Sequence, residues 1–153
     1  MKLLRVENDR YFFHLVPREK DLLAVILRLY PVVPPAHQPL SKSSPLEPAT
    51  ERLLNEALAE QRKENKKLIE QLLGDKRRFR ETEDSVEMIL TAGDIEWVLQ
   101  VLNDVHVGNW VLMGSPETRP RFSPESKDAR FVVAMDLACM FQSELLQAID
   151  RGS

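Results

Sequence analysis

The sequence predicts a mainly α-helical protein, with four helices and a small N-terminal antiparallel β element in one domain over residues 1–153. Three observations predict this class. Apolar residues recur at helical spacing along most of the chain, two β-prone runs flank a short polar turn near the N-terminus, and prolines gather in one segment. With 43% apolar and 29% charged residues, the chain has the composition of a soluble globular domain with one core.

The N-terminal part predicts a hairpin followed by a helix. Residues 3–6 and 11–15 are β-prone runs around a short polar loop, which is typical of a β-hairpin. Pro17 suits the first turn of a helix, where its missing N–H costs nothing, and this helix is expected to run to about Tyr30. Residues 31–48 contain six of the ten prolines, so they predict an extended connection.

The middle of the chain predicts a second helix and a third strand. The helix is expected over roughly residues 49–73, with opposite charges at supportive spacings on one side. Its other side carries an apolar stripe of Leu54, Leu58, Leu68, Ile69 and Leu72. Residues 86–90 predict a strand that joins the hairpin, because two strands alone would be marginally stable.

Two further helices are expected in the C-terminal half. The run TAGD at residues 91–94 resembles a capping box and opens a helix that ends near Gly114. The run SPE at residues 123–125 combines a cap, a first-turn proline and an acid, so it predicts the start of a last helix that runs to about Ile149. The apolar stripe of this last helix is Phe131, Ala134, Met135, Ala138, Phe141, Leu145 and Ile149.

Charge is segregated along the chain. Residues 81–118 contain eight acids and neither lysine nor arginine, and a basic run, KRRFR, directly precedes them at residues 76–80. This run can contact a phosphate backbone or form salt bridges with the acidic segment, within or between subunits. Because the whole chain has a net charge of −3, a nucleic-acid partner is not expected.

Composition and spacing limit the chemistry that the chain is expected to perform. The single cysteine, Cys139, excludes an intrachain disulfide and favours a reducing compartment. No signal-peptide pattern and no apolar run near the ~20 residues of a membrane span is found, so a cytoplasmic protein without membrane contact is expected. The three histidines are scattered and no nucleophile or phosphate-loop motif occurs. We therefore expect no metal site, no cofactor and no catalytic residue, and the pattern leans away from an enzyme.

The helix that begins near residue 94 carries the candidate site residues. On a helical wheel, His106 and Asn109 fall within the apolar face, and buried polar groups must be hydrogen-bonded. The pattern leaves two alternatives open. In the first, His106 and Asn109 are structural residues whose polar groups are hydrogen-bonded within the protein, for example to Asn103. In the second, Asn103, His106 and Asn109 line a small polar pocket in which His106 acts as acid, base or ligand.

Trp97 lies off the main apolar face of this helix, on the same side as Asp104. A large aromatic there either packs on a second layer or marks an interface, where tryptophan is enriched. A helix with apolar residues on both sides also needs contacts on both sides. We therefore expect a protein partner or a homo-oligomer, with Trp97 and Asp104 at the contact.

The segment WVLQVLNDV, residues 97–105, resembles the W-L-x-x-L-N-D signature of a bacterial family of unknown function, described mainly from actinobacteria. His106 stands where the family pattern has an arginine, and residues 109–114 match its end loosely. The resemblance implies a mainly helical fold without an established activity. Genes of the family often lie beside the adaptor of the Clp protease, which implies a link to proteolysis.

Two functions are carried forward from these patterns. The first is a non-enzymatic interaction or regulatory protein of the bacterial cytoplasm, favoured by the two-sided helix, the segregated charge and the lack of a catalytic constellation. The alternative is a small-ligand-binding or enzymatic protein with a polar pocket around His106.

Overall fold

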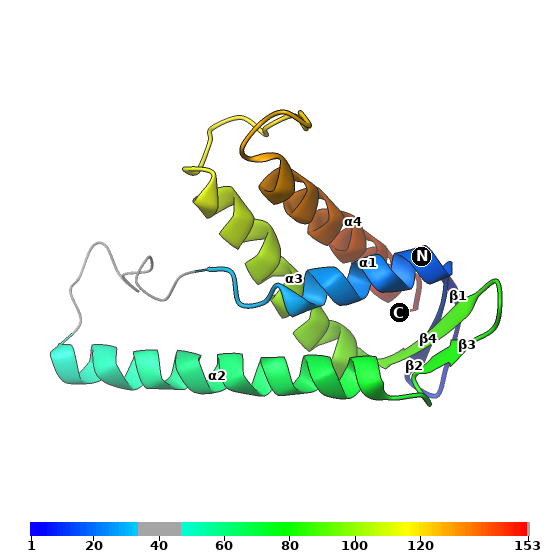
Figure 1. The fold of residues 1–153 in the computed structure, drawn as a ribbon. Coiled ribbons are helices and arrows are strands. Elements are labelled where there is room, and N and C mark those ends of the chain that lie inside the picture. The colour runs from blue at the N-terminus through cyan, green and yellow to red at the C-terminus, as the bar shows by residue number, and fades with distance from the viewer. Residues whose placement is uncertain (34–46, 153) are drawn as a thin grey trace.

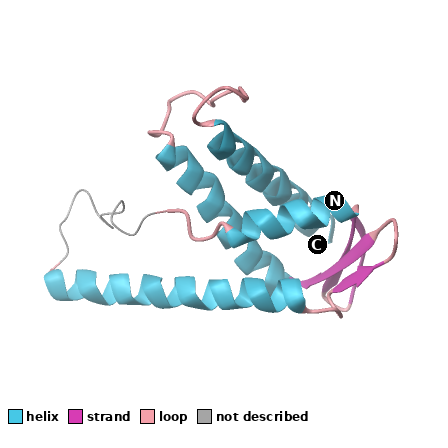
Figure 2. Ribbon diagram, viewed as in Figure 1, coloured by secondary structure: helices cyan, strands magenta, loops and turns pink. Residues whose placement is uncertain are grey.

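The computed structural model describes residues 1–33 and 47–152. Within these ranges the chain is 60% helical, with four helices and one four-stranded antiparallel sheet, which confirms the mainly helical class (Figures 1 and 2). The elements, in chain order, are β1 (Lys2–Glu7), β2 (Arg10–Leu15), α1 (Pro17–Arg28), α2 (Pro48–Gly74), β3 (Phe79–Glu81), β4 (Val86–Thr91), α3 (Ala92–Leu112) and α4 (Ala129–Gly152). Most of the predicted proline-rich connection, residues 34–46, lies outside the described residues.

The sheet has the strand order β1-β2-β4-β3. β1 and β2 form the predicted hairpin, and its two-residue loop places Asn8 and Asp9 at φ angles of 51° and 60°. Loops of this type match the right-handed twist of the strands, and Asn and Asp tolerate positive φ better than most residues. β4 pairs with β2 from Val86 to Thr91, which confirms the predicted third strand.

The sequence did not predict β3. The expected β element was a hairpin or a three-stranded sheet, whereas the observed sheet has four strands. β3 has only three residues and pairs with β4 across a turn in which the Thr82 N–H donates to the Ser85 carbonyl at 2.9 Å. Only Phe79 of the strand is buried, while Arg80 and Glu81 are exposed. A short edge strand with one apolar residue carries no alternating pattern, because the sheet neighbour rather than the strand itself provides the stabilising contacts.

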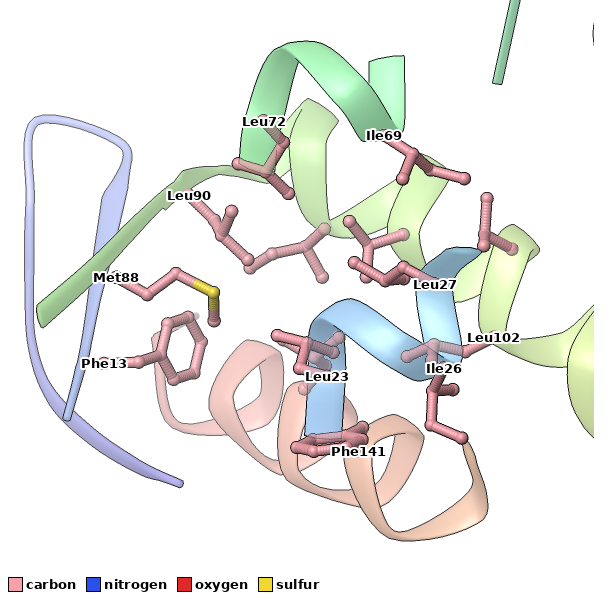
Figure 3. Close-up of a cluster of buried hydrophobic side chains, with 14 of the residues drawn as sticks. Phe13, Leu23, Ile26, Leu27, Ile69, Leu72, Met88, Leu90, Leu102 and Phe141 are labelled. Atoms are coloured by element: carbon pink, nitrogen blue, oxygen red, sulfur yellow. The ribbon is translucent and has the colours of Figure 1, made fainter. Parts of the chain in front are cut away.

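The core lies between the sheet and the four helices, with α1 at its centre (Figure 3). Phe13 and Met88 extend from the sheet toward Leu23 of α1, Leu72 approaches from α2, and Phe141 closes the core from α4. All five side chains are at most 3% exposed. Burying a side chain of this size contributes ~1.5–3 kcal/mol, so this cluster fixes how the elements pack.

α3 and α4 form an antiparallel helical hairpin joined by residues 113–128 (Figure 1). The predicted capping box at the start of α3 is confirmed, because the Asp94 N–H donates to Thr91 Oγ1 at 3.1 Å and the Thr91 N–H donates to Asp94 Oδ2 at 3.0 Å. The predicted start of the last helix was wrong, since α4 begins at Ala129 rather than at residues 123–125. Residues 124–128 contain no large apolar side chain that could pack on α3, and local signals without packing rarely hold a helical turn.

α2 is the longest helix, and only its C-terminal half packs on the rest of the chain. Asn65, Ile69 and Leu72 are buried, whereas every residue from 48 to 61 is exposed. Figure 1 shows this N-terminal half extending away from α1 and α3. We call residues 48–61 the α2 tip. Leu54 and Leu58 of the predicted stripe belong to it, so two of the five stripe residues are exposed.

Candidate protein-binding groove

Trp97, one of the two predicted interaction residues, is half-buried against the core. Its indole N–H donates to Asp94 Oδ1 at 3.2 Å, and the same oxygen accepts from Arg78 Nη1 at 3.1 Å. These bonds tie the first turn of α3 to the segment before β3. The Arg78–Asp94 pair, together with an Arg80–Glu87 contact of 3.6 Å, confirms the predicted salt bridges between the basic run and the acidic segment.

Asp104, the other predicted interaction residue, holds the chain that follows α1 against α3. Its Oδ1 accepts from the Val32 N–H at 2.6 Å and from the Val33 N–H at 3.3 Å. One turn later Gly108 allows this segment to approach closely, because a Cβ at Gly108 would lie 2.6 Å from Val32 Cβ and 2.9 Å from the Val33 nitrogen. Trp97 and Asp104 therefore both have contacts inside the chain, and their role at an interface stays a prediction.

The same segment is fixed from the side of α2. Arg62 Nη2 donates to the Val33 carbonyl at 2.9 Å, and Asn65 Nδ2 donates to Tyr30 Oη at 3.2 Å. Burial raises the pKa of the Tyr30 phenol, the hydrogen bond from Asn65 lowers it, and the nearby Asp104 carboxylate raises it; the net direction is upward. Residues 30–33 are therefore a rigid junction between α1, α2 and α3.

The three residues of the predicted polar pocket have different surroundings. His106 is half-buried, and its Nδ1 lies 3.2 Å from Gln142 Oε1 on α4. Asn109 is buried and donates from Nδ2 to the Val105 carbonyl of its own helix at 2.7 Å, while Asn103 is exposed. His106 and Asn109 thus both have hydrogen-bond partners within the chain, and a ligand-binding role for His106 stays a prediction.

An apolar groove, which the sequence did not single out, lies between α1, the end of α3, the 113–128 loop and the start of α4. We call it the apolar groove, and its volume is about 570 Å³. α1 contributes one face at helical spacing, with Leu22, Val25 and Leu29. The complete lining is Leu22, Val25, Ile26, Leu29, Val32, Asn109, Leu112, Phe122, Ala129, Arg130, Phe131, Val133, Ala134 and Leu137.

The groove presents large apolar side chains to solvent. Val25 is 58% exposed, Phe122 54% and Leu112 48%. Contiguous exposed apolar surface of this kind is typical of binding sites. Among the described residues that line the groove, Arg130 is the single charged one, and none carries a carboxylate, imidazole, thiol or hydroxyl group. The groove can therefore bury apolar surface but offers no pair of groups for acid–base or nucleophilic chemistry.

One signal in the sequence could have located this groove. The helix after Pro17 is almost entirely apolar beyond Asp21, and a helix that is apolar on all sides needs contacts on all sides. In the structure, Leu23, Ile26 and Leu27 face the core, while Val25 and Leu29 remain exposed at the groove. α1 has more apolar residues than its core-facing side needs, and the remaining ones line the groove. The opposite wall of the groove is formed only when α3 and α4 pack beside α1.

Within residues 1–33 and 47–152, no group of three or more His, Cys, Asp or Glu residues lies close enough to hold a metal ion. By length and composition alone, one helix in these ranges, α4, could cross a membrane. This is weak support for a membrane span, because a core helix passes the same test and α4 buries Met135, Phe141 and Leu145 in the core.

Comparison of the chain with protein-family models, with curated proteins and with solved structures finds no match. The resemblance of residues 97–105 to a bacterial family therefore stays a prediction, and the function has to be argued from the geometry of the chain itself.

Proposed function

We propose that this protein is a non-enzymatic interaction module and that the apolar groove binds an amphipathic helix of a protein partner. The observation that carries this proposal is the groove itself, an apolar depression of about 570 Å³ walled by three helices. Its volume lies in the range of ~300–1,000 Å³ that is typical of ligand sites. The exposed Val25, Leu112 and Phe122 gain most from an apolar occupant.

The shape and the lining favour a helix as the occupant. α1 and α4 each present apolar residues at helical spacing, Val25 and Leu29 on one side and Val133 and Leu137 on the other. A helix that enters between them completes a packed layer, as in other helix-in-groove complexes. Arg130 at the edge favours a partner with a carboxylate beside its apolar stripe.

A regulatory role linked to Clp-type proteolysis in the bacterial cytoplasm is part of the proposal. It is supported only by the resemblance of residues 97–105 to the bacterial family and by the single free cysteine, Cys139, which suits a reducing compartment.

The test is capture of partners from native lysate with the wild-type protein and two matched variants. Val133→Glu introduces a charge into the groove, whereas Leu146→Glu makes the same kind of change on α4 outside it. Both side chains are exposed, so each variant should keep its stability within ~0.5 kcal/mol. A partner retained by Leu146→Glu and lost by Val133→Glu supports the proposal. Equal retention by both variants contradicts it, and so does the absence of both a captured partner and self-association through the groove.

A further inference from the structure

We infer that the occupant of the apolar groove is the α2 tip of a second copy of this chain, exchanged reciprocally within a two-fold dimer. The inference rests on the proposed function of the groove and names its partner. It is motivated by two surfaces that remain exposed among residues 1–33 and 47–152, the apolar groove and the apolar stripe of the α2 tip.

The α2 tip is a helical segment whose residues are not buried in the core. All its residues from 48 to 61 are exposed, and Leu53 is 66% and Leu58 43% exposed. The tip is continuous with the packed half of the 27-residue α2, but most helical stability in proteins comes from packing of an apolar face, which the exposed residues of the tip do not have. A tip with three exposed leucines, Leu53, Leu54 and Leu58, therefore fits a helix that is stabilised by a partner.

The apolar face of the tip continues along α2 into the face that packs against the core. Leu54 and Leu58 lie one turn apart and share a face with Ile69 and Leu72, which are buried in the core of the same chain. This face thus has the composition of a helix surface that packs between other helices. The groove offers the tip an equivalent environment, with walls from α1, α3 and α4.

Charge favours contact between tip and groove over contact between two tips. The tip carries three carboxylates, Glu51, Glu56 and Glu60, and one arginine, Arg52. The groove has Arg130 in its lining and the exposed Arg121 next to Phe122. Two acidic tips that lie side by side repel each other, whereas a tip in the groove places its carboxylates near these guanidinium groups.

The positions of the two surfaces permit a closed dimer. Val32 lines the groove, and its neighbour Val33 is bonded to Arg62 at the base of the tip, so the two surfaces meet at one junction. When a two-fold axis passes near this junction, each copy inserts its tip into the groove of the other and no surface remains free for a third copy. Because the contact forms twice, the dimer buries twice the area of one tip–groove contact.

The experiment measures the mass of the full-length protein in solution by sedimentation over a range of concentrations. The wild type is expected to be a dimer. Leu58→Glu in the tip and Val133→Glu in the groove should each weaken the dimer by at least ~30-fold. Each substitution is present in both copies, so it places a charge in both tip–groove contacts of the dimer. Ala59→Glu, ~100° around the helix from Leu58 and off the Leu54–Leu58 stripe, and Leu146→Glu, outside the groove, are the matched controls and should remain dimeric. Circular dichroism checks that each variant is folded.

Mixing the two disrupted variants gives the decisive outcome. A copy with Leu58→Glu retains an intact groove and a copy with Val133→Glu retains an intact tip, so a mixed dimer keeps one undamaged contact. The mixture should therefore form dimers at concentrations where each variant alone is monomeric. Pairing of tip with tip predicts the opposite, since Val133→Glu would then remain a dimer by itself and the mixture would show no recovery.

The outcomes separate this inference from the proposed function. A monomeric wild type, a dimeric Val133→Glu variant or a mixture that stays monomeric overturns the exchange of tips. If the wild type is monomeric but still captures a different protein that Val133→Glu loses, the groove remains a binding site and only its occupant was wrong. If neither a dimer nor a partner that depends on the groove is found, both proposals fall.

Discussion

Replacing Gly108 with alanine should destabilise the protein, although alanine is the better helix former. In the middle of α3, this change alone would favour the helix by ~0.8–1 kcal/mol. The new Cβ would, however, lie 2.6 Å from the Cβ and Cγ1 of Val32 and 2.9 Å from the backbone nitrogen of Val33. Real Cβ atoms do not approach so closely, so the segment that follows α1 has to move.

The cost of this movement exceeds the gain in helix propensity. Overpacking at a close contact costs ~1–3 kcal/mol. The same shift weakens the hydrogen bonds from the Val32 and Val33 N–H groups to the Asp104 carboxylate, and bonds to charged acceptors contribute ~1.5–3 kcal/mol each. With partial loss of these bonds, we expect a net destabilisation of ~2 kcal/mol, which lowers the Tm of a domain of this size by ~4–8 °C.

The measurement is urea and thermal unfolding of Gly108→Ala beside Gly93→Ala. Gly93 lies in the first turn of the same helix, where a Cβ would meet only Thr91 Oγ1, at 3.8 Å. Alanine at Gly93 should therefore stabilise the protein by a few tenths to ~1 kcal/mol. Opposite signs at the two positions are expected. If both substitutions stabilise the protein, the close packing of residues 32 and 33 on α3 is refuted.

Three further predictions follow from single side chains. Asp94→Asn should lower the free energy of unfolding by ~2 kcal/mol, measured in urea, since this carboxylate accepts from Arg78, from the indole of Trp97 and from the backbone of α3's cap; no change would contradict its role. The phenol of Tyr30 should titrate above its ordinary pKa of 10.0 in an ultraviolet titration of a Tyr11→Phe variant, because burial favours its neutral form. Its contribution to stability is present below about pH 10 and is lost as the pH rises through the folded value; titration at or below 10 would refute its burial. Glu19→Gln should destabilise the protein at neutral pH, and the difference from the wild type should shrink as the pH falls below 4.5. Although burial raises the pKa of Glu19, hydrogen bonds from the N-terminal amine and from the Val16 N–H lower it below 4.5, so its contribution is lost as the pH falls through the folded value. A difference between variant and wild type that persists in acid would contradict this ion pair.

How much of the candidate site the sequence revealed can be judged from α1 and α3. The excess of apolar residues in α1 was visible, but only the packing of α3 and α4 decides which of them are buried in the core, such as Leu23 and Leu27, and which are exposed at the groove, such as Val25 and Leu29. The predicted pair Trp97 and Asp104 has hydrogen-bond partners within the chain. Its partners, Asp94 at 3.2 Å and the Val32 N–H at 2.6 Å, could not be read from the sequence, because one is a capping side chain and the other is backbone 72 residues away.

The sequence by itself determined the elements that depend on local chemistry. Asn8-Asp9 set the two-residue hairpin, the Thr91–Asp94 capping box set the start of α3, and periodic apolar residues set four helices. The tertiary structure decided the features that depend on neighbours. Residues 79–81 form a strand because they pair with β4. α4 begins only at Ala129 because residues 124–128 offer no large apolar side chain for packing. Leu54 and Leu58 are exposed because α2 extends beyond its contacts with the core. Propensity acts within a few residues, whereas burial is decided by segments that meet across the chain, and for that reason the groove and the unpacked tip became visible only in the folded structure.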